Sequence, residues 1–258
     1  MLLVIDVGNT NIVLGIYDKE QLIRDWRIRT ERNTTEDEFS VLMAGLFSAG
    51  GIRFDEITNT IISCVVPPMV PILDPFCKKY LNHAAHWVDA QSITDMPNLY
   101  GNPSEVGADR IVNAVGAYHK YPTSLIVIDF GTATTFDAIS AAGEYLGGAI
   151  SPGIGIAAEA LYTHASKLPR VEIFKPPAKI IGRDTIGSIQ SGIIFGYAGL
   201  VDGIVGRMKT EMGAPTPRVI ATGGLAPLMK GVAQSIEAVE QTLTLEGLKL
   251  ISQKIQPR

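Results

Sequence analysis

The stretch "VIDVGNTNIVLG" at residues 4–15 is an apolar run that leads into an aspartate, a glycine and small polar residues, before a second apolar run begins. A similar stretch, "VIDFGTATTFDAI", follows at residues 127–139, at an offset of 123 in a chain of 258 residues. Both stretches predict a strand, a tight turn and a returning strand. We interpret the pair as a duplicated hairpin, and the alternative is a chance match of two short β-rich segments.

Five positions are identical when the two stretches are aligned at this offset. The matched pairs are Val4 and Val127, Ile5 and Ile128, Asp6 and Asp129, Gly8 and Gly131, and Ile16 and Ile139. Because the offset is close to half of the chain, we expect two similar domains, over residues 1–118 and 119–258. The remaining pattern predicts a mixed α/β fold, with a capped helix over residues 35–51 where a threonine precedes acidic residues.

The composition excludes several classes of protein. A chain with 46% hydrophobic and 19% charged residues is typical of a globular protein rather than a disordered one. Its 22 basic residues are outnumbered by 26 acidic ones. No basic field therefore predicts a nucleic acid or an anionic membrane as a partner.

Cysteine usage and the first residues indicate a cytoplasmic protein. Cys64 and Cys77 form no CxxC arrangement, so neither a disulfide framework nor a zinc site is predicted. The opening "MLLVID" predicts a first strand rather than a signal peptide. Prolines interrupt apolar stretches such as "IISCVVPPMVPIL" (61–73). None reaches the roughly 20 apolar residues that a membrane span needs.

A second periodic feature lies near residue 200. Residues 192, 196, 199, 203 and 206 are all glycine, a spacing that places them along one face of a helix. Such a face allows another backbone to approach closely, either from a helix of the same domain or from a second subunit. Asp202 and Arg207 argue against a membrane span. The sequence leaves the two packing interpretations open.

The two turns "DVGNT" and "DFGTATT" predict a phosphate-binding site. Glycine and small residues after a strand let backbone N–H groups and threonine hydroxyls approach phosphate oxygens. Two such hairpins would hold a polyphosphate from opposite sides, with Asp6 and Asp129 facing the metal ions that neutralise it. The alternative is that each aspartate only caps its turn. The chain contains no G-x-x-x-x-G-K-[ST] motif, so a Walker-type NTPase is not supported.

Two short motifs add to this hypothesis. "ATGG" at residues 221–224 closes a predicted strand and leaves room for an adenine or a ribose. "GADR" at residues 107–110 opens a predicted helix, where Asp109 is favoured as a carboxylate and would accept a proton from a substrate hydroxyl. Arg110 would bind an anionic group. The alternative is a helix-start aspartate next to a solvated arginine.

Other candidate patterns are weaker. Gly153, Gly155 and Ala158 match the relaxed dinucleotide-binding fingerprint, with Glu172 near the position of a ribose-binding acid. Pro152 interrupts the junction between strand and turn, so we interpret this match as accidental. The four histidines have no acidic or cysteine partner at a metal-binding spacing, so we expect no zinc site from them.

The motifs "DVGNTNIVLG", "GADR", "DFGTATT", "GGAISPG" and "ATGG", in this order and spacing, resemble those of type III pantothenate kinases over nearly the whole chain. The resemblance implies the actin and hexokinase-like superfamily: an α/β chain of two duplicated ribonuclease-H-like (actin-like ATPase) domains with a nucleotide cleft between them. It also implies ATP-dependent phosphorylation of the 4′-hydroxyl of pantothenate, the first step towards coenzyme A. The enzyme would be a homodimer that needs Mg²⁺ or another divalent metal and a monovalent cation, K⁺ or NH₄⁺.

The resemblance further implies roles for individual residues. Asp109 would be the general base, Asp6 would serve Mg²⁺, and Asp129 would help to place the monovalent cation. Thr185 would reach the pantothenate pocket from the partner subunit. The residues that would contact ATP are Asp6, Val7, Gly8, Asn9, Thr10, Asn11, Ile12, Val13, Thr132, Gly223 and Gly224. Those that would line the pantothenate pocket are Tyr100, Gly107, Ala108, Asp109 and Arg110.

Three rival functions stay open at this point. A kinase for another small hydroxyl compound would differ only in its acceptor pocket. A nucleotide-binding regulator would keep the nucleotide site without phosphoryl transfer, although the intact Asp109 and Arg110 argue against it. A dehydrogenase based on Gly153 and Gly155 is the most distant of the three.

Overall fold

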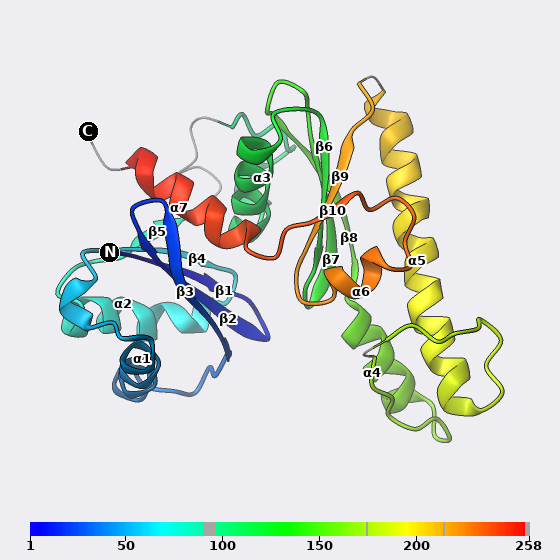
Figure 1. The fold of residues 1–258 in the computed structure, drawn as a ribbon, viewed down its shortest axis with the longest axis horizontal. Coiled ribbons are helices and arrows are strands. Elements are labelled where there is room, and N and C mark those ends of the chain that lie inside the picture. The colour runs from blue at the N-terminus through cyan, green and yellow to red at the C-terminus, as the bar shows by residue number, and fades with distance from the viewer. Residues whose placement is uncertain (90–95, 174, 214, 256–258) are drawn as a thin grey trace. The chain divides into compact units, whose positions relative to one another are not determined.

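The computed structural model describes residues 1–89, 96–173, 175–213 and 215–255, and they form two compact units (Figure 1). Unit 1 consists of Met1–Asp95, Gly101–Gly116 and Leu243–Arg258, and unit 2 consists of Met96–Tyr100 and Ala117–Thr242. The expected boundary between residues 118 and 119 stays a prediction. The structure adds that the C-terminal segment packs with unit 1, so that unit is built from three stretches of chain.

The sheet of unit 1 has five strands in the order β3-β2-β1-β4-β5. The first three strands form an antiparallel meander, and β4 and β5 continue the sheet in parallel to β1. Both neighbours of β1 therefore end or begin beside the turn that follows Asp6. The strands are β1 (Leu2–Val7), β2 (Asn11–Asp18), β3 (Gln21–Arg29), β4 (Asn59–Cys64) and β5 (His86–Val88).

The sheet of unit 2 repeats this topology. Its order is β10-β9-β6-β7-β8, with β6, β7 and β8 antiparallel and β9 and β10 parallel to β6. The expected duplication of the hairpin is thus confirmed, and it extends to the whole five-stranded sheet. The strands are β6 (Leu125–Phe130), β7 (Ala133–Ile139), β8 (Tyr145–Pro152), β9 (Arg218–Thr222) and β10 (Ala238–Val239).

The two hairpin turns differ in length by one residue. In unit 1 the last pair before the turn is Val7 with Ile12, which leaves residues 8–11 in the turn. In unit 2 the last pair is Phe130 with Thr134, which leaves residues 131–133. The strands that enter the two turns match at the expected offset, but the strands that leave them do not.

One of the five aligned pairs is therefore wrong. Ile139 lies opposite Leu125 in unit 2, and the residue in the equivalent place of unit 1 is Tyr17, opposite Leu2. Ile16 thus corresponds to residue 138 rather than to Ile139. A constant offset cannot hold across turns of different length, because the shorter turn shifts every later residue by one position.

The first core of unit 1 lies on one face of its sheet. Helices α1 (Glu36–Gly50) and α2 (Val70–Tyr80) cover this face. Leu3, Ile5 and Val7 point towards these helices because side chains alternate along a strand, and they share a buried cluster with residues such as Phe47 and Phe76. Asp6 therefore points to the opposite face. Short 3₁₀ turns lie at Phe54–Glu56, Pro67–Met69 and Pro103–Glu105.

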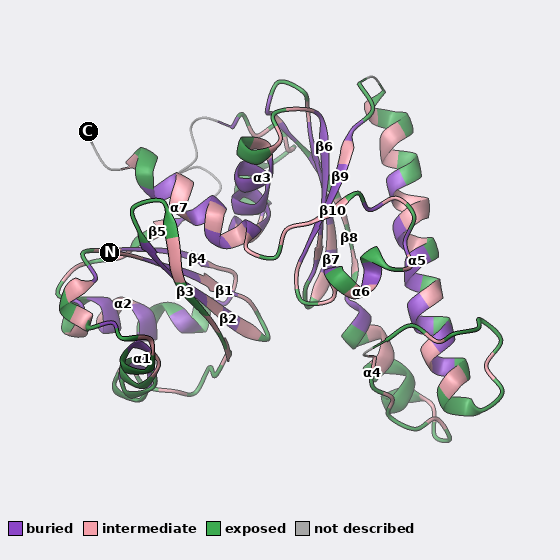
Figure 2. Cartoon of the chain, viewed as in Figure 1, coloured by how far each residue is buried: buried purple, intermediate pink, exposed green. Residues whose placement is uncertain are grey.

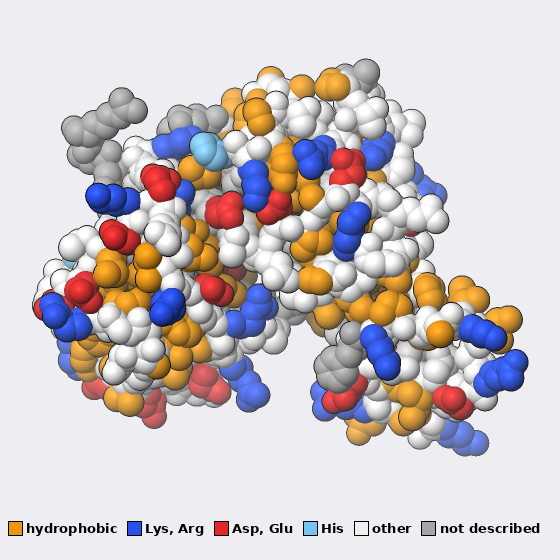
Figure 3. Space-filling view, in the orientation of Figure 1, with side chains coloured by type: hydrophobic (Ala, Val, Ile, Leu, Met, Phe, Trp, Pro, Cys, Tyr) orange, Lys and Arg blue, Asp and Glu red, His pale blue; other side chains and the backbone are white. Residues whose placement is uncertain are grey.

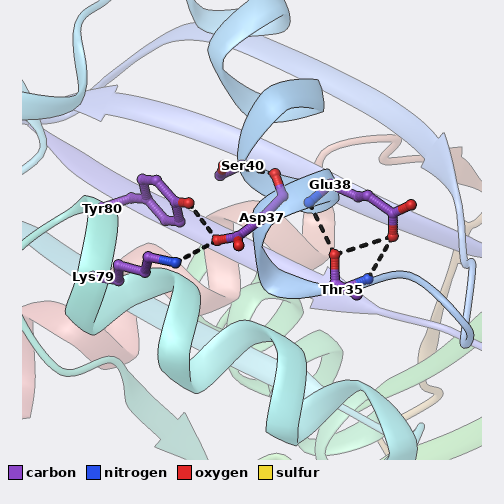
Figure 4. A network of polar contacts seen from close by, with 6 residues as sticks. All are labelled: Thr35, Asp37, Glu38, Ser40, Lys79 and Tyr80. Carbon is purple, nitrogen blue, oxygen red and sulfur yellow. Dashed lines mark hydrogen bonds and ion pairs between the residues drawn. The ribbon is translucent and has the colours of Figure 1, made fainter.

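Helix α1 begins with the expected cap (Figure 4). The Thr35 hydroxyl accepts from the backbone N–H of Glu38 at 3.2 Å, and the Glu38 carboxylate accepts from the backbone N–H of Thr35 at 2.8 Å. This reciprocal capping box satisfies two amide donors at the helix start. Asp37 in the same turn contacts Lys79 and Tyr80 of α2, and hydrogen bonds from these side chains lower the pKa of Asp37.

The other face of the unit 1 sheet carries α7 (Leu243–Ile255), and the start of α3 (Ala108–Lys120) packs on α7. A methyl group at Gly247 would overlap the carbonyl oxygen of Val112. The two helices approach at this point to a distance that only glycine allows. Helix α3 is therefore fixed over the face of the sheet to which Asp6 points.

In unit 2, α4 (Ile154–His164), α5 (Thr185–Met212) and α6 (Ala226–Lys230) contribute to one core with β6, β7 and β9. Helix α5 is long and apolar enough to cross a membrane by length and composition. However, 44% of its most apolar window is buried inside the protein, and Ile193 and Val201 belong to the core. This burial favours a core helix over a membrane span.

Figure 2 shows both buried and exposed residues along α5, and the exposure of each glycine decides on which side of the helix it lies. Gly192, Gly196, Gly199 and Gly206 are exposed. A methyl group placed on any of these four would have no other heavy atom within 4 Å among the described residues. The interpretation of this face as a helix contact within the domain is therefore wrong for the described part of the chain, and the subunit interface stays a prediction.

Candidate active site

The turn after Asp6 is a rigid backbone loop. The N–H of Gly8 donates to the carbonyl of Asn11 at 3.0 Å, which closes the turn. Thr30, which follows β3, donates its hydroxyl to the carbonyl of Gly8 at 2.6 Å and its N–H to the carbonyl of Thr10 at 3.0 Å. The first of these bonds lies within the turn, and the other two connect the turn to Thr30. The backbone is thus pre-shaped before any ligand arrives.

A positively charged side chain, that of Arg32, contacts the same turn. The Arg32 guanidinium donates to the Asn9 amide oxygen at 2.9 Å, and both residues are exposed. Neither Thr30 nor Arg32 was a sequence-predicted site residue. Their contacts depend on the pairing of β2 with β3, which brings the end of β3 next to the beginning of β2. An exposed turn with a neighbouring guanidinium is suited to an anion such as phosphate.

The expected ATP-site residues around this turn divide into two kinds. The side chains of Val7 and Ile12 are buried in the core, with at most 1% exposed. Val13 is paired with Asp6 across the hairpin. These apolar residues offer a ligand only backbone atoms or support. Asn9 and Thr10 are exposed and can offer side-chain groups as well.

Asp109 lies in the first turn of α3. Its carboxylate accepts from the backbone N–H of Arg110 at 2.8 Å. Burial raises the pKa of Asp109, and the N–H and the positive charge of Arg110 oppose part of that shift. A carboxylate whose pKa is raised is a stronger base than an exposed one.

Gly107 makes this position of Asp109 possible. A methyl group at Gly107 would lie 2.5 Å from the Asp109 carboxylate oxygen and 3.7 Å from a methyl of Val65. Val65 follows β4 and donates its N–H to the carbonyl of Val7 at 3.1 Å. The structure thus brings Asp109 to the strand ends that carry the Asp6 turn, within unit 1.

Arg110 and Ala108 are buried, with 7% and 8% of their surfaces exposed. The alternative of a solvated arginine is therefore wrong. A buried guanidinium is costly unless anionic or polar groups accept its hydrogen bonds, and it is a strong partner for a carboxylate. Arg110 is thus suited to hold an anionic group of an acceptor substrate beside Asp109.

Two further polar residues lie beside Asp6 on β4. Ser63 is opposite Asp6 in the parallel register and is fully buried, and its hydroxyl has no hydrogen-bond partner among the described residues. Burial raises the pKa of the Cys64 thiol, and the charge of Asp6 adds to this effect. Sequence reasoning missed Ser63, because an isolated serine in an apolar strand carries no motif.

In unit 2, the end of β6 meets the "ATGG" turn. Gly223 has a φ of +91°, and a methyl group there would lie 2.5 Å from the Asp129 carboxylate oxygen and 2.7 Å from the N and O atoms of Phe130. Only glycine suits this position, both for its backbone conformation and for its space. Gly224, the next residue, is exposed. The structure thus brings the expected residues Asp129 and Gly223 into contact.

The turn that carries Thr132 is held differently from its counterpart in unit 1. The N–H of Gly131 donates to the carbonyl of Ala133, and the N–H of Gly153 donates to the carbonyl of Thr132 at 3.1 Å. A methyl group at Gly153 would overlap that carbonyl oxygen. Gly153 thus packs beneath the turn, and this contact explains part of the accidental dinucleotide-like pattern.

Tyr100 and Thr185 lie on different elements of unit 2. The ring of Tyr100 is 6.4 Å from the ring of Tyr145. Thr185 is the first residue of α5, where the Asp184 carboxylate accepts from the N–H of Gly187 at 2.7 Å. Thr185 also lines an open cavity of about 830 Å³, together with Leu161, Leu168 and Gly192.

The described residues contain no group of three or more His, Cys, Asp or Glu side chains that could hold a metal ion. A protein-only metal cage is therefore absent from the described ranges. Mg²⁺ in kinases commonly needs only one or two carboxylates, because the substrate phosphates supply other ligands. Single carboxylates at strand ends, such as Asp6 and Asp129, suit that kind of site.

The sheet order, with a polar turn after the first strand of each unit, defines the class of protein. A solved structure of an inorganic polyphosphate/ATP-glucomannokinase from Arthrobacter sp. strain KM aligns with 98% of this chain and 98% of its own, at a TM-score of 0.52 and 15% identity. The two structures share an actin-like α/β fold with two units, and in this chain the topology of the two units is duplicated.

Sequence relatives define a narrower group than the fold does. The family model for type III pantothenate kinase matches residues 2–207. A type III pantothenate kinase of Desulfatibacillum aliphaticivorans is 66% identical over 99% of both chains, and one of Desulfosudis oleivorans is 61% identical over 97% of this chain and 98% of its own. The chain therefore belongs to the type III pantothenate kinase family, and it is a phosphotransferase.

Proposed function

We propose that the protein transfers the γ-phosphoryl group of ATP to the 4′-hydroxyl of pantothenate, the first step of coenzyme A synthesis. Membership of the type III pantothenate kinase family supports the substrate. The observation that carries the mechanism is the position of Asp109, folded over Gly107 at the strand ends that bear the Asp6 turn. This position supports a role of Asp109 as the base for an acceptor bound near the phosphate-binding turn.

Asp109 orients the acceptor hydroxyl and takes its proton. The hydroxyl donates a hydrogen bond to the carboxylate, its oxygen attacks the γ-phosphorus, and ADP leaves on the opposite side. Because phosphoryl transfer passes through a loose transition state, positioning and charge neutralisation matter more than base strength, and the proton moves late. The raised pKa of Asp109 helps it to accept the proton at that stage.

The Asp6 turn binds the ATP phosphates. Residues 8–11 present backbone atoms and small side chains, and Arg32 adds a positive charge through its contact with Asn9. The fixed turn costs little reorganisation when the phosphates arrive, because Thr30 already holds its carbonyls. In unit 2, Thr132 contributes a hydroxyl to the phosphates, and Gly223 and Gly224 leave room for the adenosine.

Asp6 is suited to Mg²⁺ and Asp129 to K⁺ or NH₄⁺. Asp6 lies at a strand end beside the turn, so its carboxylate would help to hold the divalent ion, which would neutralise the phosphate charge. The Asp129 carboxylate is closely packed by Gly223, so its oxygens have a fixed position of the kind that a monovalent cation requires. Bound cations supply charge neutralisation for the phosphates and leave the proton transfer to Asp109.

Pantothenate binds through its two ends. Its hydroxyl end faces Asp109, and the buried Arg110 guanidinium holds its carboxylate. Gly107 and Ala108 present backbone and little bulk, and the Tyr100 ring supplies an apolar wall.

Homodimerisation completes the pocket with Thr185 of the second subunit. Helix α4, the residues before α5 and the first turn of α5 expose several large apolar side chains, and Figure 3 shows hydrophobic side chains on the surface in this part of unit 2. These residues are Ile156, Leu161, Tyr162, Ile180, Ile181 and Ile186. The exposed glycines of α5 follow these apolar residues in the sequence. Because they have no side chains, a helix of a second subunit can approach α5 closely there.

The reaction itself is tested with purified protein, pantothenate, ATP and Mg²⁺, with and without K⁺, and mass spectrometry of the products. The expected product is pantothenate heavier by one phosphoryl group, formed faster with K⁺. A panel of other hydroxyl acceptors tests the nearest rival. Phosphorylation of another acceptor in place of pantothenate would contradict the substrate, and ATP binding without any product would favour the regulatory alternative.

The dimer is tested by sedimentation of the wild type and of Gly199→Leu. A leucine on the bare face of α5 is expected to convert a dimer into monomers, because it separates the two backbones. Gly45→Leu is the matched control, since Gly45 is an exposed helical glycine of α1 with no neighbour in its side-chain direction. A monomeric wild type, or a dimer that tolerates leucine at position 199, would contradict this assignment. A cytoplasmic location stays a prediction.

A further inference from the structure

A buried carboxylate on β7 belongs to none of the sites described above. Asp137 is fully buried. Its carboxylate accepts from the Tyr145 hydroxyl at 2.7 Å and from the Thr135 hydroxyl at 3.3 Å. Removing a carboxylate from water is costly, so such a group persists only where hydrogen bonds compensate it. The hydrogen bond from Tyr145 to Asp137 thus compensates for the burial of this carboxylate.

The backbone of Tyr145 holds the segment that carries Tyr100. The N–H of Tyr145 donates to the carbonyl of Pro97 at 2.8 Å, and the N–H of Leu99 donates to the carbonyl of Tyr145 at 2.9 Å. Together they form a parallel bridge centred on Asn98. Residues 96–100 belong to unit 2, although the residues before and after them belong to unit 1. Tyr145 therefore attaches this short segment to unit 2.

The Tyr100 ring is also placed from this side. It lies 6.4 Å from the Tyr145 ring, and a methyl group at Gly147 would come within 3.2 Å of it. The Asn98 amide oxygen accepts from the N–H of Tyr100 at 3.1 Å. The direction of Tyr100 is thus set by Tyr145, by the missing side chain at Gly147 and by Asn98.

Strand β7 holds Tyr145 at both its backbone and its hydroxyl. Its backbone pairs with Ile139 of β7. Its hydroxyl is held by Asp137, which lies two residues before Ile139 on β7. Thr135, the second donor to Asp137, lies opposite Asp129 in the β6 and β7 pair. The network therefore starts at the strand pair that bears Asp129 and ends at the Tyr100 segment.

We infer that Asp137 and Tyr145 are positioning residues for the acceptor pocket: their buried hydrogen bond fixes the 96–100 segment and thereby the Tyr100 wall against which pantothenate binds. The inference rests on the proposed function, because that function assigns Tyr100 to the pantothenate pocket. Neither residue touches the reacting atoms. Loss of the hydrogen bond weakens acceptor binding and leaves the ATP site and the chemical step in place.

The test is Tyr145→Phe, which removes the hydroxyl and keeps the ring and both backbone bonds. The expected result is a KM for pantothenate about tenfold higher, with the KM for ATP and kcat within about twofold of the wild type, which corresponds to the loss of one hydrogen bond to a charged group. Asp137→Asn keeps an acceptor oxygen for Tyr145, so its KM for pantothenate is expected to rise less.

The matched control is Tyr121→Phe. Tyr121 also donates its hydroxyl to a carboxylate of unit 2, that of Glu240, in a part-buried contact. Its removal is expected to leave the KM for pantothenate unchanged. Equal changes in both KM values for Tyr145→Phe, or the same change in the control, would overturn the positioning role.

Hydrogen exchange gives a second readout that does not need activity. In Tyr145→Phe the backbone N–H of Leu99 is expected to exchange about tenfold faster than in the wild type, because its acceptor is less firmly held. Tyr121→Phe is expected to leave that rate unchanged. An unchanged Leu99 rate in Tyr145→Phe would overturn the inference. A wild type that fails to phosphorylate pantothenate would overturn the proposed function, while the exchange rates would still decide whether Tyr145 anchors the segment.

Discussion

The turn after Asp6 and the turn after Asp129 occupy equivalent places in sheets of the same order, but they are built differently. The first turn has four residues, is exposed at Asn9 and Thr10, and is held from outside by Thr30 and Arg32. The second has three residues and is packed from beneath by the backbones of two glycines, Gly153 and Gly223.

Under the proposed function, one duplicated topology serves two chemical tasks. An exposed turn with a neighbouring guanidinium is suited to a large polyanion. A shorter turn with a closely packed carboxylate offers a small site of fixed geometry. The difference arises from one residue of turn length and from glycines that allow close packing, and the strand order does not change.

The largest expected effect comes from exchanging glycine for alanine at Gly8, in the first turn, and at Gly223, which packs against the strand end that enters the second turn. Gly223→Ala combines a positive φ with contacts of 2.5 to 2.7 Å, so it is expected to lower the free energy of unfolding by about 3 kcal/mol. Gly8→Ala meets one carbonyl oxygen at 3.2 Å, and about 1 kcal/mol is expected.

Urea unfolding measures both changes, and steady-state kinetics separates them further. Gly8→Ala is expected to raise the KM for ATP about tenfold, equivalent to the loss of about 1.4 kcal/mol of binding, because its methyl group crowds the carbonyl of Asn11 and distorts the turn assigned to the phosphates. Equal losses of stability in the two variants would break the distinction between an open and a packed turn.

The pH dependence of turnover is the next effect in size. Because burial raises the pKa of Asp109, the carboxylate is protonated at a pH at which an exposed aspartate is still charged. The rate is expected to fall about tenfold for each pH unit below that raised pKa. ATP also titrates in the acid range, and this affects the rates of both enzymes equally. The ratio of the wild-type rate to the Asp109→Asn rate therefore reports on Asp109. A ratio that stays constant through the acid range would contradict a role of Asp109 as the base.

The smallest expected effect concerns the support of the first turn. Thr30→Val removes the hydroxyl that donates to Gly8 and is expected to cost about 1 kcal/mol of stability. Thr35→Ala removes the α1 cap in the same unit and is expected to cost about the same. Only Thr30→Val is expected to raise the KM for ATP, by about threefold to tenfold. Of the two threonines, Thr30 contacts the Asp6 turn, which the proposed function assigns to the phosphates, and Thr35 does not. An equal KM in both variants would show that Thr30 has no more than a structural role.

Much of this fold could be predicted from local sequence. The hairpins, the capped α1 and the strand before "ATGG" follow from apolar periodicity and turn chemistry, which act over a few residues. The packing of α7 on unit 1 could not be predicted in this way, because it depends on contacts such as that of Gly247 with Val112, far apart in sequence. The one-residue difference between the turns likewise required the strand register.

The candidate site shows the same limit. Asp109 and the glycine turns lie in recognisable motifs, whereas Thr30, Ser63 and Tyr145 act through cross-strand pairing that no short motif records. Asp137 did leave a signal: it is an acidic residue inside the otherwise apolar and hydroxyl-bearing strand of "TTFDAI". A charge at such a position indicates either an exposed edge or a buried partner, and only the structure identifies Tyr145 as that partner.

The most direct measurement of the central claim compares Asp109→Asn with the wild type in turnover, ATP affinity and stability. Asparagine keeps an oxygen that accepts from the N–H of Arg110, so the helix start is preserved. We expect kcat to fall by on the order of 10² or more, with unchanged ATP binding. The free energy of unfolding at neutral pH is expected to stay equal or rise, because the variant no longer buries a charge whose pKa is raised. An Asp109→Asn enzyme that turns over pantothenate at nearly the wild-type rate would contradict the account.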